Sequence, residues 1–194
     1  TIYLFRHGET DWNKEKRFMG QTQIALNDKG KEQALKLAQR VKKVALVKLY
    51  SSDLLRTGRT AEIIATERGS DIEYDPRFRE IDGGLCTGLR IAEMRDKYRS
   101  WWQENEKDSY MARFPEGENF YELVDRVKEG ISEISNKYNN QNIGIVTHGG
   151  VINSIIIDIL GVPQSKRDRI TLDNCGITTI SWSKSNPKII SINS

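Results

Sequence analysis

Short apolar runs that read as buried strands alternate with helix-like segments along most of this chain of 194 residues. The apolar runs lie at 2–5, 44–50, 72–74, 142–147, 177–182 and 188–192. The helix-like segments lie at 27–44, where Asn27 or Asp28 can cap the start, and at 54–68, 120–138 and 151–160. This alternation predicts an α/β fold, a three-layer sandwich with a largely parallel central sheet and helices on both faces. Ligands of such sheets bind beside the carboxyl ends of the strands.

Two parts of the chain depart from this alternation. Residues 75–119 are expected to be irregular, and within them residues 98–118 form a candidate lid. The aromatic side chains of this lid either face the organic part of a substrate or anchor the segment to the core: Trp101, Trp102, Tyr110 and Phe114. Near the end of the chain, Ser185-Asn186-Pro187 separates two apolar runs and predicts a hairpin.

Composition excludes several classes of protein. Hydrophobic residues make up 37% and charged residues 29%, which is typical of one globular domain, here residues 1–194. The net charge of +3 is spread over interspersed acids and bases, so we expect no nucleic-acid partner. No apolar run reaches the length of a membrane span and no leader pattern opens the sequence, so we expect a cytoplasmic protein that binds no membrane. Cys86 and Cys175 lack metal-ligand spacing and are expected to be reduced thiols, with one disulfide as the alternative.

Both histidines of the chain follow a predicted strand and precede glycine. His7 stands in Arg6-His7-Gly8, and His148 stands in Thr147-His148-Gly149-Gly150. The second strand leads to Arg56 at a helix start, and Glu80 follows the short third strand. Taken singly, each of these residues has an ordinary structural explanation as a packed histidine, a surface cation or a solvated carboxylate. As a set at one edge of a sheet they are candidates for a site.

This set suits phosphoryl transfer without a metal ion or cofactor. A neutral imidazole can attack phosphorus and form a phosphohistidine. Arginine binds phosphoryl oxygens in pairs, and a carboxylic acid can protonate the leaving alkoxide and then activate water. Glycine lets the backbone approach a phosphate closely. These arguments from the residues do not decide which histidine attacks.

Five blocks of the sequence together resemble the histidine phosphatase superfamily, in its phosphoglycerate mutase-like branch and its small bacterial phosphatase type. The resemblance spans nearly the whole chain and rests on FRHGETDWN, YSSDLLRTGRTAEII, RFREIDGGLCTGL, FPEGENFYELVDRV and IGIVTHGG. It implies that His7 is the nucleophile and Glu80 the general acid and base. It further implies phosphoryl-group ligands at Arg6, Arg56 and His148, and substrate-binding residues at Asn13, Gly20 and Gly149. The family commonly has Gln or Thr where this chain has Met19, and aromatic-Glu where it has Cys86-Thr87.

The resemblance leaves three functions open. The first is a phosphomonoesterase for a small phosphorylated metabolite such as α-ribazole phosphate, phosphoserine, a sugar phosphate or a phosphoglycerate. The second is a phosphoglycerate mutase dependent on 2,3-bisphosphoglycerate, although such mutases are longer in the middle and tail. The third is a non-catalytic phosphate-binding regulatory module, which would be expected to lose the nucleophile or the acid. We expect the phosphomonoesterase, as a monomer or homodimer.

Other phosphatase and hydrolase chemistries fit the sequence poorly. A cysteine nucleophile needs arginine six positions later, where Cys86 meets Ala92 and Cys175 meets Ser181. The sequence contains neither a Gly-x-Ser-x-Gly elbow nor a Walker loop. Two histidines without an aspartate-rich cluster do not suit a two-metal site.

Overall fold

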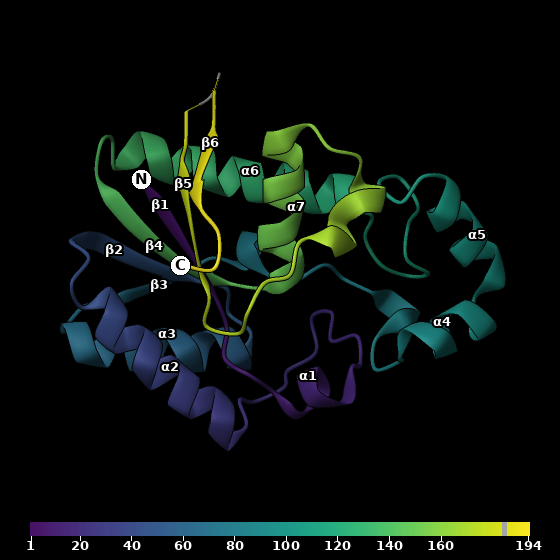
Figure 1. Cartoon of the computed structure of the whole chain (residues 1–194), viewed down its shortest axis with the longest axis horizontal. Coiled ribbons are helices and arrows are strands. Elements are labelled where there is room, and N and C mark those ends of the chain that lie inside the picture. Colours follow the sequence, from purple (N-terminus) through teal and green to yellow (C-terminus); the bar gives the residue numbers. More distant parts are fainter. Residues whose placement is uncertain (184–185) are drawn as a thin grey trace.

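The computed structural model describes residues 1–183 and 186–194, and in these a mixed sheet of six strands lies between helical layers (Figure 1). The strand order is β3-β2-β4-β1-β5-β6. The strands are β1 (Ile2–Arg6), β2 (Leu46–Ser51), β3 (Ile72–Tyr74), β4 (Asn142–Thr147), β5 (Ile177–Ser181) and β6 (Lys188–Ser191). Strand β1 pairs parallel with β4, and β2 pairs parallel with β3 and with β4. Strand β5 pairs antiparallel with β1 and with β6. The predicted α/β fold is confirmed.

Two pairs of helices cover the two faces of the sheet. Helices α2 (Asp28–Val41) and α3 (Leu55–Arg68) lie below it in Figure 1, and α6 (Phe120–Lys137) and α7 (Gly149–Leu160) lie above it. Successive side chains of a strand point to opposite faces. Phe5 therefore packs in the core cluster of α2 and α3, whereas Leu4 packs in the cluster of α6 and α7.

The helix boundaries follow local signals that the sequence carries. Asn27 is the N-cap of α2, and its side chain accepts a hydrogen bond from the Gly30 amide at 2.8 Å. Helix α7 begins at Gly149, two residues earlier than its apolar periodicity predicts. A short helix that the sequence did not predict, α1 (Asp11–Glu15), follows β1 and contains no buried residue. Without a buried face, a single turn of helix leaves no periodic pattern to detect.

The prediction that residues 75–119 are irregular is wrong. They contain α4 (Ile91–Lys97) and α5 (Arg99–Lys107), together with the 3₁₀ turns Pro76–Phe78 and Gly84–Cys86. Helix α4 has seven residues and α5 has nine, and each buries one residue, Met94 and Trp101 respectively.

The aromatic residues of the candidate lid belong mainly to the core. Trp101 and Phe114 are buried, and their ring centroids lie 4.6 Å apart within the cluster of α6 and α7. Trp102 and Tyr110 pack against the same cluster and are partly buried. Of the two predicted roles, these contacts support anchoring of the segment to the core.

Three smaller predictions concern the end of the chain, the cysteines and the membrane. The antiparallel pairing of β5 with β6 agrees with the predicted hairpin, although Ser185 of its turn lies outside the described residues. Cys86 and Cys175 are buried free thiols. In the described part of the chain, no helix combines the length and the apolar character that crossing a membrane requires.

Candidate active site

The register of the central strands brings the two histidines together. Arg6 of β1 pairs with Thr147 of β4, so His7 and His148 leave adjacent parallel strands at the same level. The His7 amide donates to the Thr147 carbonyl at 3.0 Å. The two imidazole rings are 1% and 0% exposed, and their centroids lie 5.3 Å apart at an interplanar angle of 60°. The pair predicted from two strand ends therefore forms one buried unit.

One hydrogen bond defines the tautomer of His7. Its Nδ1 lies 2.7 Å from the Gly8 carbonyl oxygen. Because a carbonyl only accepts, Nδ1 carries the proton and Nε2 carries a lone pair. Burial, and then the positive charges of Arg56 and Arg6, hold the pKa of His7 well below its usual range. Near neutral pH, His7 is thus a neutral imidazole with a lone pair on Nε2.

His148 is held by a residue at the end of β2, which flanks β4 on the side away from β1. Ser52 follows β2, and its Oγ lies 2.7 Å from His148 Nε2 and 2.6 Å from Thr57 Oγ1. Burial, followed by the charge of Arg56, keeps the pKa of His148 well below its usual range. His148 Nδ1 is buried and has no hydrogen-bond partner among the described residues.

Two arginines place further donors beside the histidines. Arg56, at the start of α3, is fully buried, and it donates to the carbonyls of Thr22 at 2.9 Å and Gly20 at 2.7 Å. Arg6 donates to the Leu172 carbonyl. Burial lowers the pKa of Arg56 to about 10, so its guanidinium remains charged at neutral pH.

Three buried nitrogens of these side chains lack a hydrogen-bond partner within the part of the chain that the structure describes: Arg6 Nε, Arg56 Nε and His148 Nδ1. Buried polar groups are nearly always satisfied in folded proteins, so an unsatisfied set that shares charge interactions indicates a ligand site. Two of these three nitrogens belong to guanidinium cations, so the ligand that they suit is an anion.

Glu80 reaches this region from a loop. Its Oε2 accepts from the Gly150 amide in the first turn of α7 at 3.0 Å, and its Oε1 accepts from the Ile81 amide at 2.9 Å. A Cβ atom at Gly150 would lie 2.3 Å from Glu80 Oε1, so the glycine makes room for the carboxylate.

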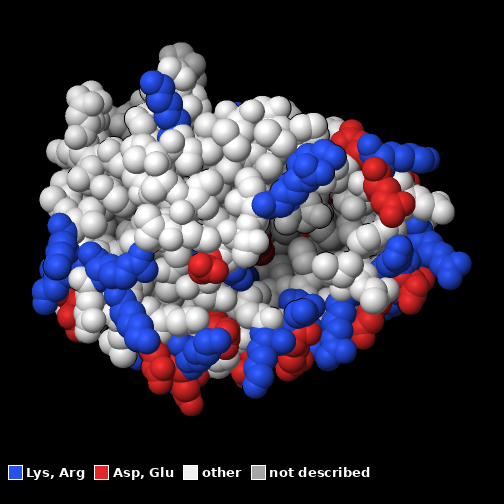
Figure 2. All heavy atoms as spheres, viewed as in Figure 1, with Lys and Arg blue, Asp and Glu red and all other residues white. Residues whose placement is uncertain are grey.

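A cavity of about 260 Å³ opens between these groups. Its described lining consists of Arg6, His7, Met19, Glu80, Gly149, Gly150, Asn153, Ile170 and Leu172. Figure 2 shows a hollow on the face viewed, with Lys and Arg side chains on its rim. The cavity places Arg6 and His7 beside the Glu80 carboxylate, with Met19, Ile170 and Leu172 in its wall. His148 and Arg56 are buried behind this surface and are not among its described lining residues.

Two predicted substrate-binding residues have other contacts. Asn13 Oδ1 accepts from the Thr10 amide at 3.0 Å in the capping box of α1. Gly20 has a φ of +50° and offers its carbonyl to Arg56. The described residues that line the cavity include neither of them, so their contact with a substrate stays a prediction.

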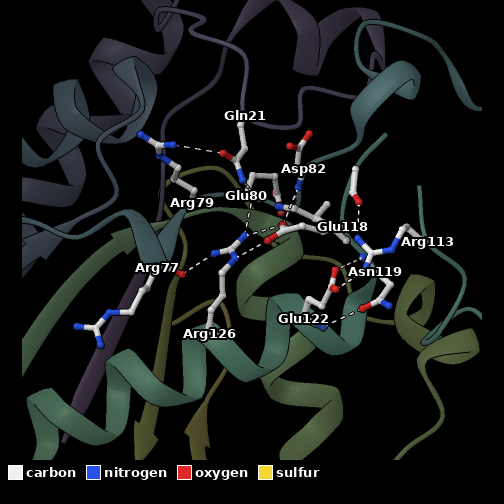
Figure 3. Close-up of polar contacts among 12 residues, drawn as sticks. Gln21, Arg77, Arg79, Glu80, Asp82, Arg113, Glu118, Asn119, Glu122 and Arg126 are labelled. Carbon is white, nitrogen blue, oxygen red and sulfur yellow. Dashed lines mark hydrogen bonds and ion pairs between the residues drawn. The ribbon is translucent and has the colours of Figure 1, made fainter. Parts of the chain in front are cut away.

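Sequence reasoning missed several residues around the site. Ser52 follows an apolar strand, and the rule that located the histidines could have found it. Gln21, Glu118 and Arg126 surround the Glu80 loop (Figure 3). Arg126 lies at the edge of the apolar stripe of α6, and this position of a cation beside buried residues was its one signal in the sequence.

A metal site would need several ligating side chains close together. In the described residues, no group of three or more His, Cys, Asp or Glu side chains could hold a metal ion.

Comparison with known proteins identifies the family. The sequence matches the histidine phosphatase superfamily (branch 1) over residues 2–194. The chain belongs to this superfamily. It is 36% identical over 184 residues to the probable phosphoglycerate mutase GpmB of Escherichia coli, a match that covers 95% of this chain and 86% of the relative.

Solved structures of this superfamily share the fold. A phosphoserine phosphatase mutant from Entamoeba histolytica, in complex with phosphoserine, is 27% identical with a TM-score of 0.86, over 100% of this chain and 96% of the other. The α-ribazole phosphatase of Shigella flexneri is 25% identical with a TM-score of 0.86, over the same shares of the two chains. The predicted family is confirmed, and the relatives are phosphatases and mutase-like enzymes.

Proposed function

We propose that the protein is a phosphomonoesterase that hydrolyses a small phosphorylated metabolite through a phosphohistidine on His7. The observation that carries this proposal is the state of the two imidazoles. His7 presents a neutral Nε2, and beside it lie three buried nitrogens without partners in the described chain, two of them on cations. A nucleophile beside donors for an anion is what attack on a phosphate ester requires.

The first half of the reaction transfers the phosphoryl group to the enzyme. Nε2 of His7 forms a bond to phosphorus while the bond from phosphorus to the alcohol oxygen breaks. Arg6 and Arg56 neutralise charge on the phosphoryl oxygens. A bound dianion favours the imidazolium form of His148, which donates from both ring nitrogens. Glu80, in its protonated form, gives its proton to the departing alkoxide.

The second half restores the enzyme. Water attacks phosphorus, the bond between phosphorus and Nε2 breaks, and Glu80 accepts the proton that the water loses. Inorganic phosphate then leaves, and His7 is again neutral. Each proton that Glu80 donates is replaced in the second step, so the cycle consumes only water and the ester.

The size of the cavity supports a small substrate. A volume of about 260 Å³ suits a small metabolite rather than a polymer or a phosphoprotein. Met19, Ile170 and Leu172 offer apolar contact to the organic part of the substrate. Phosphoserine, α-ribazole phosphate, sugar phosphates and phosphoglycerates are the candidates that the resemblance suggests.

A phosphoglycerate mutase is the second candidate, and the similarity to GpmB favours it. The chemistry on His7 would be the same, but the phosphoryl group would return to a second hydroxyl instead of passing to water. A non-catalytic phosphate-binding module is a weaker candidate, because the chain keeps both His7 and Glu80.

A screen of phosphorylated metabolites, with and without 2,3-bisphosphoglycerate, separates these functions. The proposal predicts release of inorganic phosphate from one or more esters, unaffected by EDTA and inhibited competitively by vanadate. Isomerisation of phosphoglycerate only in the presence of the bisphosphate would select the mutase. Binding of phosphate without turnover of any ester would select the regulatory module.

A further inference from the structure

Glu80 belongs to an irregular loop whose position depends on side chains from other elements. Residues 79–83 connect the 3₁₀ turns Pro76–Phe78 and Gly84–Cys86. The Glu80 carbonyl accepts from Gln21 Nε2 at 3.2 Å and from Arg126 Nη2 at 3.0 Å (Figure 3). Strand pairing therefore does not position this carboxylate, although it positions both histidines.

Arg126 makes four hydrogen bonds from α6 to the loop and its support. In addition to Glu80, it donates to the Arg77 carbonyl at 2.5 Å. It also pairs bidentately with Glu118, with distances of 2.8 Å for Nε–Oε1 and 3.0 Å for Nη2–Oε2. A planar guanidinium engaged on both sides in this way has little rotational freedom.

Glu118 extends the same support to the far side of Glu80. Its Oε2 accepts from the Asp82 amide at 2.8 Å, and its own amide donates to the Asp82 carbonyl at 2.9 Å. The pair of Arg126 and Glu118 thus holds the main chain at positions 77, 80 and 82. Its side chains are only 19% and 21% exposed, so solvent screens the pair weakly.

The core does not depend on this pair. Helix α6 is anchored by buried residues such as Leu123 and Val127 and by its own capping box at Asn119. The start of the loop is anchored by Phe78, which is buried and whose carbonyl accepts from Thr147 Oγ1 at 2.7 Å. Loss of the guanidinium should therefore loosen the loop around Glu80 and leave the fold intact.

From these contacts we propose that Arg126, paired with Glu118, is a positioning residue that aims the Glu80 carboxyl at the leaving oxygen of the substrate. This inference rests on the proposed function of Glu80 as the general acid. Arg126 touches no reacting atom and acts through the main chain of residues 77–82. Its effect should appear in the steps in which Glu80 gives or accepts a proton, and the first of these steps depends on the leaving group.

Substrates with different leaving groups distinguish a misplaced Glu80 carboxyl from a general defect in folding or phosphate binding. An alkyl phosphate releases a strongly basic alkoxide and needs the proton of Glu80, whereas p-nitrophenyl phosphate releases a stable anion and needs it little. A defect in phosphate binding or in folding lowers kcat/KM for both esters by the same factor. A misplaced acid lowers it mainly for the alkyl ester.

The experiment measures kcat and KM for p-nitrophenyl phosphate and for the best alkyl phosphate of the screen, with Tm as the check of folding. The variants are Arg126→Gln, Arg126→Lys and Glu118→Gln, compared with Glu80→Gln. Lys128→Gln is the matched control, because Lys128 is a cation of the same helix that pairs with Asp158 of α7 at 2.9 Å. Arg126→Lys keeps the charge, and thus provides the readout if Arg126→Gln does not fold.

We expect Arg126→Gln to lower kcat/KM for the alkyl ester by about 10- to 100-fold, with less than about a threefold change in kcat/KM for p-nitrophenyl phosphate. The comparison uses kcat/KM because this constant reports transfer to His7, whereas kcat also includes the later attack of water, in which Glu80 acts for both esters. Arg126→Lys should show the same selectivity at smaller size, and Glu118→Gln combined with Arg126→Gln should lose no more than the larger single effect. Lys128→Gln should retain wild-type kinetics. Equal losses for the two esters would overturn the positioning role.

The outcome for Glu80→Gln keeps the two proposals apart. If Glu80→Gln shows the leaving-group selectivity and Arg126→Gln does not, the positioning role is wrong and the proposed function stands. If Glu80→Gln itself shows no selectivity, the assignment of Glu80 as the acid is wrong, and the positioning role is overturned together with it.

Discussion

The two halves of the candidate site are built in different ways. The half around the histidines is formed by the ends of β1, β2 and β4. Backbone pairing places His7 level with His148, and Ser52 follows the last pair of β2 with β4, which is Ser51 with Val146. The half around Glu80 is an irregular loop held by side chains, above all by Arg126 and Glu118.

The positions of the two histidines are therefore fixed by the sheet, whereas the position of Glu80 depends on a few side-chain contacts. The histidine half cannot shift without breaking strand pairs of the central sheet. The loop that carries Glu80 is not paired with the sheet, so we expect loss of the Arg126 guanidinium to shift this loop without breaking a strand pair. Changes in the first half should therefore affect every ester, and changes in the second should depend on the leaving group.

The largest effect should come from the nucleophile. His7→Ala should lower kcat/KM for aryl and alkyl phosphates alike by at least about 1,000-fold, because no bond to phosphorus can form. His148→Ala should lower both by about 100-fold, since it removes charge stabilisation and keeps the nucleophile. Steady-state assays of the two variants with both esters make the comparison, and near-normal turnover by His7→Ala would contradict it.

A smaller and more selective effect should follow from removal of the acid. Glu80→Gln keeps the size of the side chain but cannot donate the same proton. We expect kcat/KM for alkyl phosphates to fall by about 100- to 1,000-fold and kcat/KM for p-nitrophenyl phosphate to fall far less, because only the first needs a proton on its leaving oxygen. Glu62→Gln, which alters a surface carboxylate paired with Arg59 on α3, serves as the control. Uniform loss across leaving groups would mean that the two halves do not differ as described.

The smallest effect is on stability. Burial lowers the pKa of His7 and of His148 below the ordinary value of 6.5. Above that pH, neither the folded nor the unfolded chain protonates these rings, and they make no pH-dependent contribution. Below it, the unfolded chain takes up protons that the folded chain does not. The free energy of unfolding should then fall by about 1.4 kcal/mol per pH unit for each ring, until the folded pKa is reached.

Urea denaturation of wild-type protein and His148→Asn between about pH 7 and pH 5 measures this term. The variant should lose stability less steeply with falling pH, because one of the two buried rings is gone. Identical slopes would show that His148 titrates in the folded protein as it does in the unfolded chain, which contradicts its burial as a neutral ring.

The same division explains what the sequence could predict. Continuous apolar runs identify strands that are buried on both faces, and parallel strands align their carboxyl ends. The positions of His7 and His148 follow from those two rules, and Ser52 would have followed from them as well. The central strands and the four large helices were predicted within a few residues for the same reason.

The remainder depends on single long-range contacts that no periodic pattern records. Helices α4 and α5 are seven and nine residues long and each bury one side chain, so each gives only a short pattern in the sequence. The hydrogen bond from Arg126 to Glu80 joins residues that are 46 positions apart. It is accepted by a main-chain carbonyl, which every residue type has, so no residue in the sequence indicates it. The substrate contacts of Asn13 and Gly20 were predicted from resemblance alone. In the structure Asn13 caps α1 and the Gly20 carbonyl accepts from Arg56, and their contact with a substrate stays a prediction.

The most direct test of the account is to trap the enzyme during turnover of a labelled phosphate ester and to locate the label. Rapid quenching in base followed by peptide mapping should find one acid-labile phosphoryl group on Nε2 of His7, because Nδ1 is occupied by its hydrogen bond to Gly8. Label on His148, label on a carboxylate, or steady turnover with no phosphoenzyme under conditions that trap such intermediates would contradict the central claim.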